Sequence, residues 1–103
     1  ETISTYWVLE NDLKQLIGNV SIVREWSDWH SGFYWWIQSM FIIPEYRGKG
    51  LANLLLQAIQ EAAKKEKVIE LRLYVHDQNG RAIRAYQKLG FRDSPYKIMT
   101  LDI

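Results

Sequence analysis

The sequence predicts a single α/β domain built on a mixed β-sheet with two helices. Three runs of β-branched and aromatic residues precede the first long stretch with helical spacing. An alternating apolar segment and a second helical stretch follow, which is the order of a parallel crossover. With 103 residues the chain is long enough for one domain with a real core, and no internal repeat is visible.

The first part of the chain predicts three antiparallel strands. Residues 5–9 are rich in β-forming side chains, and turn-forming residues follow them. Residues 15–26 alternate between apolar and polar, and Gly18 within them predicts a bulge or a close backbone approach. Residues 33–43 form a long aromatic and β-branched strand, which Pro44 ends because proline cannot donate to the ladder.

Residues 51–65 predict the first helix, because their apolar positions recur at helical spacing. These positions are Leu51, Leu54, Leu55, Ala58, Ile59, Ala62 and Ala63. Residues 68–75 alternate again and predict a strand, and residues 79–89 predict the second helix, with Gly90 as its stop. Its inward side chains are expected to be Ala82, Ile83, Tyr86 and Leu89.

Two further strands complete the predicted order β-β-β-α-β-α-β-β. A short strand is expected to begin at Phe91, and a last strand to cover residues 96–103.

The composition excludes several classes of protein. Thirteen Lys and Arg against twelve Asp and Glu give a net charge of +1, which argues against a nucleic-acid or anionic-membrane binder. The absence of cysteine excludes a disulfide framework, a thiolate zinc site and a cysteine nucleophile, and no metal is expected. No apolar run approaches the ~20 residues of a membrane span, and no signal peptide is visible, so a cytoplasmic location is expected.

The informative stretch is residues 44–52, which join the third predicted strand to the first helix. Gly48 and Gly50 allow the backbone to approach a ligand without an intervening Cβ. The first N–H groups of a helix have no internal partner and lie at the positive end of its dipole. The turn therefore favours a diphosphate.

Several interpretations of this turn are open from its residues alone. A dinucleotide fingerprint needs a third glycine where Asn53 stands, and a P-loop needs Gly-Lys followed by Ser or Thr. A third pattern, Arg/Gln-x-x-Gly-x-Gly/Ala, matches Arg47 to Ala52. A plain glycine-rich turn is the structural alternative.

Further features stand in order around the turn and carry a family resemblance. They are Met40-Phe41-Ile42, Pro44, the turn from Arg47 to Ala52, the strand 71–75, Asn79, Tyr86 and Leu89-Gly90-Phe91. On these features the sequence resembles the GNAT acetyltransferase superfamily from about residue 6 to residue 103. The segments 25–29 and 35–39 look like a bacterial subgroup, for which the resemblance gives no acceptor.

The resemblance implies the acyl-CoA N-acyltransferase fold with acetyl-CoA as cosubstrate. The pantetheine is expected to pair with the strand backbone around Met40, Phe41 and Ile42, and the diphosphate to bind the N–H groups from Gly48 to Asn53. Asn79 is expected to hold the pantetheine from the other side. The implied binding residues are Met40, Phe41, Ile42, Arg47, Gly48, Lys49, Gly50, Leu51, Ala52, Asn53 and Asn79.

The resemblance also implies direct acetyl transfer to a primary amine, either of a small molecule or of a larger acceptor. A backbone N–H of residues 40–42 would stabilise the oxyanion, and Tyr86 would be the general acid. From its spacing alone Tyr86 is a core aromatic, and one side chain can serve both purposes.

The general base stays open in the sequence. A branch of the family has a glutamate where this chain has Tyr74. The remaining candidates are His76, His30, Asp28, Glu25 or ordered water. His76 has a suitable intrinsic pKa, but a histidine at a strand end is usually structural.

The chain departs from the family pattern at its start. Typical members have a strand and two helices before the first strand predicted here, and this chain begins with Glu1 rather than Met. We therefore expect residues 1–103 to be an N-terminally truncated domain, whose missing wall is absent, disordered or supplied by a partner chain. An uncovered edge at residues 6–9, with Trp7, Trp26 and Trp29 as exposed surface, predicts a homodimer.

Two functions of other classes compete with the enzyme. One is a non-catalytic acyl-CoA-binding domain that lacks an acceptor site. The other is an RNA-binding module that uses the five tryptophans as stacking platforms, which the net charge of +1 argues against.

Overall fold

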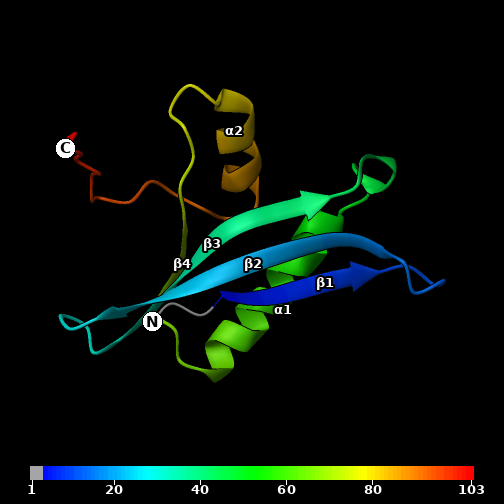
Figure 1. Ribbon diagram of the computed structural model, residues 1–103, viewed down its shortest axis with the longest axis horizontal. Coiled ribbons are helices and arrows are strands. Elements are labelled where there is room, and N and C mark those ends of the chain that lie inside the picture. Colours follow the sequence, from blue (N-terminus) through cyan, green and yellow to red (C-terminus); the bar gives the residue numbers. More distant parts are fainter. Residues whose placement is uncertain (1–3) are drawn as a thin grey trace.

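The computed structural model describes residues 4–103, which form a sheet with two helices (Figure 1). The elements in chain order are β1 (Ser4–Glu10), β2 (Leu16–Ser27), β3 (Gly32–Ile42), the 3-10 helix η1 (Pro44–Tyr46), α1 (Leu51–Lys65), β4 (Glu70–Leu73) and α2 (Gly80–Lys88). The first six predicted elements are thus present, and the structure adds the 3-10 turn, which the fixed φ of Pro44 favours at its first position.

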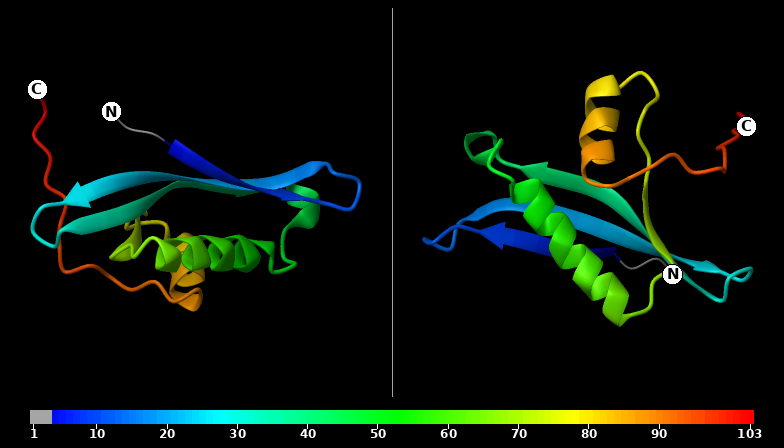
Figure 2. Two further views of the ribbon diagram at one scale, coloured as in Figure 1. Left: turned by 90° about the horizontal axis from the view of Figure 1, so that it is seen from below. Right: turned by 180° about the vertical axis from the view of Figure 1, so that it is seen from behind.

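The sheet has the order β1-β2-β3-β4, with three antiparallel strands and a parallel fourth. The predicted parallel crossover through the first helix is confirmed, because β4 pairs with β3 in parallel after α1. Both helices lie on the same side of the sheet (Figure 2). This one-sided arrangement leaves the other face without a helix within residues 4–103.

The core lies between α1 and the central strands. Its fully buried large side chains are Val20, Ile22, Trp35, Leu56 and Ile59. Trp7 packs against this cluster, with its ring 5.8 Å from that of Trp35, so it is not the exposed surface that the sequence suggested. Trp26 and Trp29 are exposed as expected.

Gly18 fulfils both alternatives predicted for it. A Cβ at this position would lie 2.8 Å from the Ile42 side chain and 3.0 Å from the Phe41 carbonyl oxygen. The register between β1 and β2 also shifts here, because Leu9 pairs with Gly18 whereas Glu10 pairs with Leu16. One residue, Ile17, is therefore inserted as a bulge.

The two last predicted strands are wrong. Phe91 begins no strand, and residues 96–103 run as coil, with Ile98, Met99 and Leu101 exposed. Alternating apolar residues favour a strand only where a sheet edge is available to pair with them, and this segment pairs with none of the described strands.

The apolar face of α1 is also rotated from its predicted position. Leu54 is exposed and Leu56 is fully buried. The buried face of α1 consists of Leu55, Leu56, Ile59 and Ala63, so it includes Leu56 in place of Leu54.

Candidate active site

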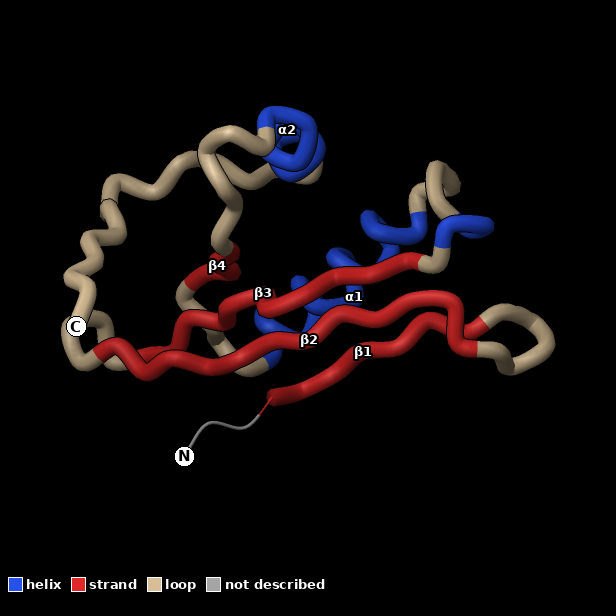
Figure 3. The backbone as a smooth tube through the Cα atoms, turned by 45° about the horizontal axis from the view of Figure 1, so that its top comes forward, coloured by secondary structure: helices blue, strands red, loops and turns tan. Residues whose placement is uncertain are grey.

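The site begins where β3 and β4 part. The parallel pairing covers only Tyr34 to Ile37 on β3 and Glu70 to Leu73 on β4. Beyond Leu73 the chain turns away toward α2, whereas β3 continues to Ile42 (Figure 3). Residues 38–42 of β3 therefore have no strand partner on that side among the described residues. An extended ligand with amide groups can pair there as a strand would.

A bulge in β3 decides which backbone groups face this open edge. Ser21 pairs with Ser39 whereas Ile22 pairs with Ile37, so Gln38 is the inserted residue. After it, the amide of Ile43 donates to the Ile17 carbonyl of β2. Because backbone groups alternate in direction along a strand, Met40 and Ile42 point away from β2 toward the open edge.

The three predicted pantetheine contacts on β3 are therefore not equivalent. Phe41 is two residues before Ile43, so its backbone N–H and C=O point in the same direction as those of Ile43, toward Asn19 of β2. Its contribution to a ligand on the open edge would come through its half-exposed ring rather than its N–H. Met40 offers both N–H and C=O, and Ile42 offers its N–H.

The glycine turn lies beyond the end of β3. Gly48 and Gly50 have φ values of 77° and 78°, in the left-handed region where a side chain causes strain. A Cβ at either position would meet nothing within 4 Å, so it would project into the open space in front of the turn. That space fits a ligand that approaches the backbone closely.

The amides of residues 48–53 have no hydrogen-bond partner within residues 4–103. The first helical bond runs from the Leu54 amide to the Gly50 carbonyl, and no side chain caps the helix start. Free amides at the positive end of the 15-residue α1 are suited to an anion, and the residues fit a diphosphate.

Charged and polar side chains surround this turn. Arg47 donates from Nε to the Ile42 carbonyl oxygen at 2.7 Å, and its guanidinium lies 5.3 Å from the Phe41 ring centre. It therefore fixes the turn against the end of β3. Lys49 lies with its ammonium 5.3 Å from the Tyr46 ring centre, and Asn53 is exposed, while Leu51 and Ala52 are partly buried.

The start of α2 brings the next predicted residue into place. Asn79 is the helix cap, because its Oδ1 accepts a hydrogen bond from the Ala82 amide at 3.2 Å. Its Nδ2 group has no partner within residues 4–103, so it stays available to donate to a ligand carbonyl.

Tyr86 lies on the partly buried face of α2, together with Ala82, Ile83 and Leu89. Its ring packs edge-on against Phe91 at 5.8 Å between centroids, and Leu89 and Phe91 donate to its backbone carbonyl. Its hydroxyl has no hydrogen-bond partner in the part of the chain that the structure describes. Tyr86 therefore packs its ring against Phe91 while its hydroxyl stays free to contact a ligand.

The candidate bases lie in different parts of the fold. His30 and Asp28 belong to the β2–β3 hairpin, at the paired end of β3, and the His30 ring lies 6.3 Å from that of Tyr34, three residues before Ile37. His76 is in the loop before α2 and its Nδ1 accepts from the Gln78 amide at 3.0 Å. Of the histidines, only His76 therefore belongs to the segment that leads from the parted strands to α2.

Sequence reasoning missed the polar and aromatic group beside the parted strands. Arg72 of β4 pairs with Glu70 at 2.7 Å and lies 3.5 Å from the Tyr34 ring centre. Burial lowers the pKa of Arg72, but its hydrogen bond and charge pairing with Glu70 raise that pKa above its ordinary value overall. Alternation along residues 68–75 placed this arginine on one face, but nothing in the sequence indicated its aromatic partners.

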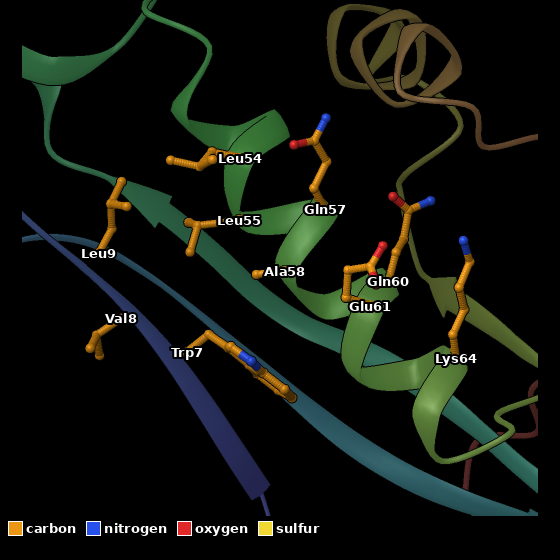
Figure 4. Close-up of a pocket in the computed structure, with 10 residues that line it drawn as sticks. All are labelled: Trp7, Val8, Leu9, Leu54, Leu55, Gln57, Ala58, Gln60, Glu61 and Lys64. Atoms are coloured by element: carbon orange, nitrogen blue, oxygen red, sulfur yellow. The ribbon is translucent and has the colours of Figure 1, made fainter.

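Two hollows lie outside the predicted site. One, of about 540 Å³, lies between β1 and α1, with Trp7, Leu9, Leu55 and Ala58 in its wall (Figure 4). The other, of about 480 Å³, lies beside the β2–β3 hairpin and Arg72. None of the predicted binding residues lines either hollow.

Within residues 4–103 no group of His, Asp and Glu side chains is placed to hold a metal ion. In the same part of the chain, no helix has the length and apolarity that crossing a membrane requires.

The fold is that of a mixed-sheet α/β domain, with a glycine-containing turn between β3 and α1 whose amides are free within residues 4–103. The acetyltransferase (GNAT) family model matches residues 1–91, so this chain belongs to the GNAT acetyltransferase family. The resemblance seen in the sequence is thereby confirmed.

Particular relatives extend this finding. The chain is 34% identical over 58 residues to thialysine N-epsilon-acetyltransferase of Bos taurus and 40% identical over 58 residues to spermine/spermidine N(1)-acetyltransferase of Bacillus subtilis strain 168. These matches cover 56% and 55% of this chain, and 34% and 38% of the relatives, so the similarity spans little more than a third of each relative. A crystal structure from Clostridium difficile 630, described as a possible acetyltransferase, superposes with a TM-score of 0.88 at 31% identity, over 97% of this chain and 66% of that one.

Proposed function

We propose that this chain binds acetyl-CoA and transfers its acetyl group to a primary amine. The observation that carries the proposal is the continuous backbone surface formed by the open edge of β3 and the free amides of residues 48–53. An extended pantetheine arm pairs with the backbone of Met40 and Ile42, and its diphosphate binds at the start of α1. Family membership supports acetyl-CoA as the ligand.

The reaction is a direct transfer. A neutral amine nitrogen attacks the thioester carbonyl carbon, an N–C bond forms, and the C–S bond breaks as the thiolate leaves. The amine must first lose a proton, because an alkylammonium of pKa ~10.4 is almost fully protonated at pH 7. The N–H of Met40 or Ile42 is directed toward the open edge and stabilises the oxyanion of the tetrahedral intermediate.

Protons move at both ends of this transfer. The Tyr86 hydroxyl donates its proton to the departing sulfur, whose thiol has a pKa of ~8.5 by analogy with cysteine. The amine loses one proton before the attack and a second one from its nitrogen as the amide forms, and these protons go to His76, to Glu25 or to an ordered water that relays them to solvent. Tyr86 recovers a proton from solvent after the product leaves.

The relatives support an amine acceptor. The names of two of them refer to thialysine and to spermine and spermidine, which all carry primary amines. The alternative is a domain that binds acyl-CoA without catalysis, since this chain spans only about a third of those relatives.

Two measurements separate the proposal from its alternative. Calorimetry with CoA tests binding, and release of free thiol from acetyl-CoA with a panel of primary amines tests transfer. We expect CoA to bind and thiol release to depend on the amine. Binding without amine-dependent thiol release would favour the non-catalytic domain, and absence of CoA binding would contradict both.

A further inference from the structure

The turn between β1 and β2 is tied by a side chain to the segment that precedes the glycine turn. Because β1 and β3 run in the same direction, the turn after β1 and η1 after β3 lie at the same end of the sheet (Figure 1). There Asn11 donates from Nδ2 to the Tyr46 hydroxyl oxygen at 3.1 Å, although the two residues are 35 positions apart. This hydrogen bond therefore joins two distant segments of the chain beside the predicted diphosphate site.

Asn11 is itself held firmly by its own turn. Its Oδ1 accepts from the Leu13 and Gln15 amides at 2.9 and 3.0 Å, and its Nδ2 also donates to Gln15 Oε1 at 2.7 Å. With the bond to Tyr46, every donor and acceptor site of this side-chain amide is used. The backbone closes the same turn, because the Asn11 amide donates to the Gln15 carbonyl and the Lys14 amide to the Asn11 carbonyl. Asn11 is thus a fixed point to which another segment can be anchored.

The glycine turn has few contacts of its own that could fix its shape. The amides of residues 48–53 are free within residues 4–103, and Gly48 and Gly50 add backbone freedom. The preceding η1 is a single short turn without a buried residue. The position of the glycine turn therefore depends on the anchors at its ends.

Two side chains anchor the N-terminal end of this turn in different ways. Arg47 donates to the Ile42 carbonyl five residues earlier, so it closes only a local loop. Tyr46 is bound by Asn11 of another strand connection, and its ring packs against the core, so it fixes the turn relative to the sheet. The same ring centre lies 5.3 Å from the Lys49 ammonium, which holds this charge next to the glycines.

We propose that Asn11 and Tyr46 are positioning residues of the CoA site, which hold the free amides of residues 48–53 and the Lys49 ammonium in their binding arrangement before the ligand arrives. This inference rests on the proposed function and deepens it, since neither residue needs to contact CoA. A turn that is already ordered loses less conformational freedom on binding, so its affinity for the diphosphate is higher.

Calorimetric titration with CoA tests the role of the hydrogen bond. Tyr46→Phe keeps the ring that packs on the core and faces Lys49, and removes only the hydroxyl. Asn11→Ser keeps an oxygen for the turn amides but is too short to reach Tyr46. We expect either variant to raise the Kd of CoA about threefold to tenfold, the range of one neutral hydrogen bond, with unchanged binding stoichiometry. The double variant should bind no more weakly than the weaker single variant, because both changes remove the same bond.

The stoichiometry separates positioning from a general loss of structure. A purely structural role would lower the fraction of protein able to bind, or the melting temperature, and leave the Kd unchanged. Tyr6→Phe removes a hydroxyl from the exposed edge of β1 and is the matched control, which should bind CoA as the wild type does. Unchanged Kd values in Tyr46→Phe and Asn11→Ser, or effects that add in the double variant, would overturn the inference.

NMR relaxation of the ligand-free protein adds a readout that does not depend on CoA. We expect the order parameters of the Gly48 and Gly50 amides to be near the rigid-backbone value of about 0.85 in the wild type and in Tyr6→Phe, and lower in Tyr46→Phe. Failure of the wild type to bind CoA would refute the proposed function and the positioning role together. If the wild type binds CoA but its order parameters equal those of Tyr46→Phe, the positioning role alone is overturned.

Discussion

At the scale of single residues, the glycines of the turn provide space as well as flexibility. Gly50 has a positive φ, and a Cβ there would project into the space that the proposed diphosphate fills. We expect Gly50→Val to weaken CoA binding by about tenfold or more, because it blocks approach to the free amides at the helix start. Calorimetric titration with CoA measures this change.

A matched control separates blocked space from backbone strain. Gly90 also has a positive φ, of 104°, but ends α2 away from the turn. Gly90→Val therefore causes comparable strain and should leave the Kd of CoA near the wild-type value. CoA binding to Gly50→Val as tight as to wild type would show that the diphosphate lies elsewhere.

The hydroxyl of Tyr86 is expected to act in chemistry rather than in packing. Tyr86→Phe keeps the ring that packs on Phe91 and removes only the unpartnered hydroxyl. The turnover number should fall by about 10²–10⁴, the usual effect of losing a general acid, while the Kd of acetyl-CoA and the melting temperature change little. Tyr6→Phe, on the exposed edge of β1, is the control. Unchanged turnover of Tyr86→Phe on a confirmed amine would exclude this role.

At the scale of elements, the cap of α2 combines a structural and a binding role in one side chain. Asn79 accepts the Ala82 amide through Oδ1, and its Nδ2 is free to donate. Asn79→Ala should lower the free energy of unfolding by about 1 kcal/mol and also weaken acetyl-CoA binding. Asn79→Ser keeps a capping oxygen but has no amide donor, so only binding should weaken. Chemical denaturation and calorimetry on both variants separate the two effects, and normal binding by both would remove Asn79 from the site.

The elements also show which features the sequence could predict. Residue patterns predicted the four strands and two helices that are present, and the two glycines of the turn were predicted to let a ligand approach the backbone, which fits their positive φ values. The inserted residue Gln38 could not be predicted, because a bulge is a property of the pairing between two strands rather than of either sequence. Yet this bulge directs Met40 and Ile42, instead of Phe41, toward the open edge.

Contacts between side chains and other segments of the chain could not be predicted from the sequence either. Arg47 turns back onto the Ile42 carbonyl, and Trp36 stacks on Tyr74 across the parted strands. Neither contact follows from periodicity, since each depends on how two segments approach in space. The predicted strand over residues 96–103 failed for the same reason, because a strand needs an edge to pair with as well as a suitable sequence.

At the scale of the whole molecule, two features of the surface remain unpaired within residues 4–103. β1 pairs only with β2, so its outer edge is open, and Tyr6 and Val8 on it are exposed. The hollow of about 540 Å³ lies directly behind this edge, against α1 (Figure 4). The second feature is the coil of residues 96–103, which exposes Ile98 and Leu101. Open strand edges and exposed apolar segments of this kind favour association.

We propose that the 103-residue chain self-associates through these features, with the β1 edge of one copy paired to a strand-forming segment of another. Light scattering at high micromolar concentration should give a mass above the 12.2 kDa of one chain. Val8→Lys places a charge on the open edge and should shift the population toward monomer, since charged residues prevent edge pairing. Gln87→Lys, at an exposed position of α2, adds the same single charge away from this edge and is the control. A single monomeric species for wild type, or equal masses for wild type and Val8→Lys, would contradict association through this edge.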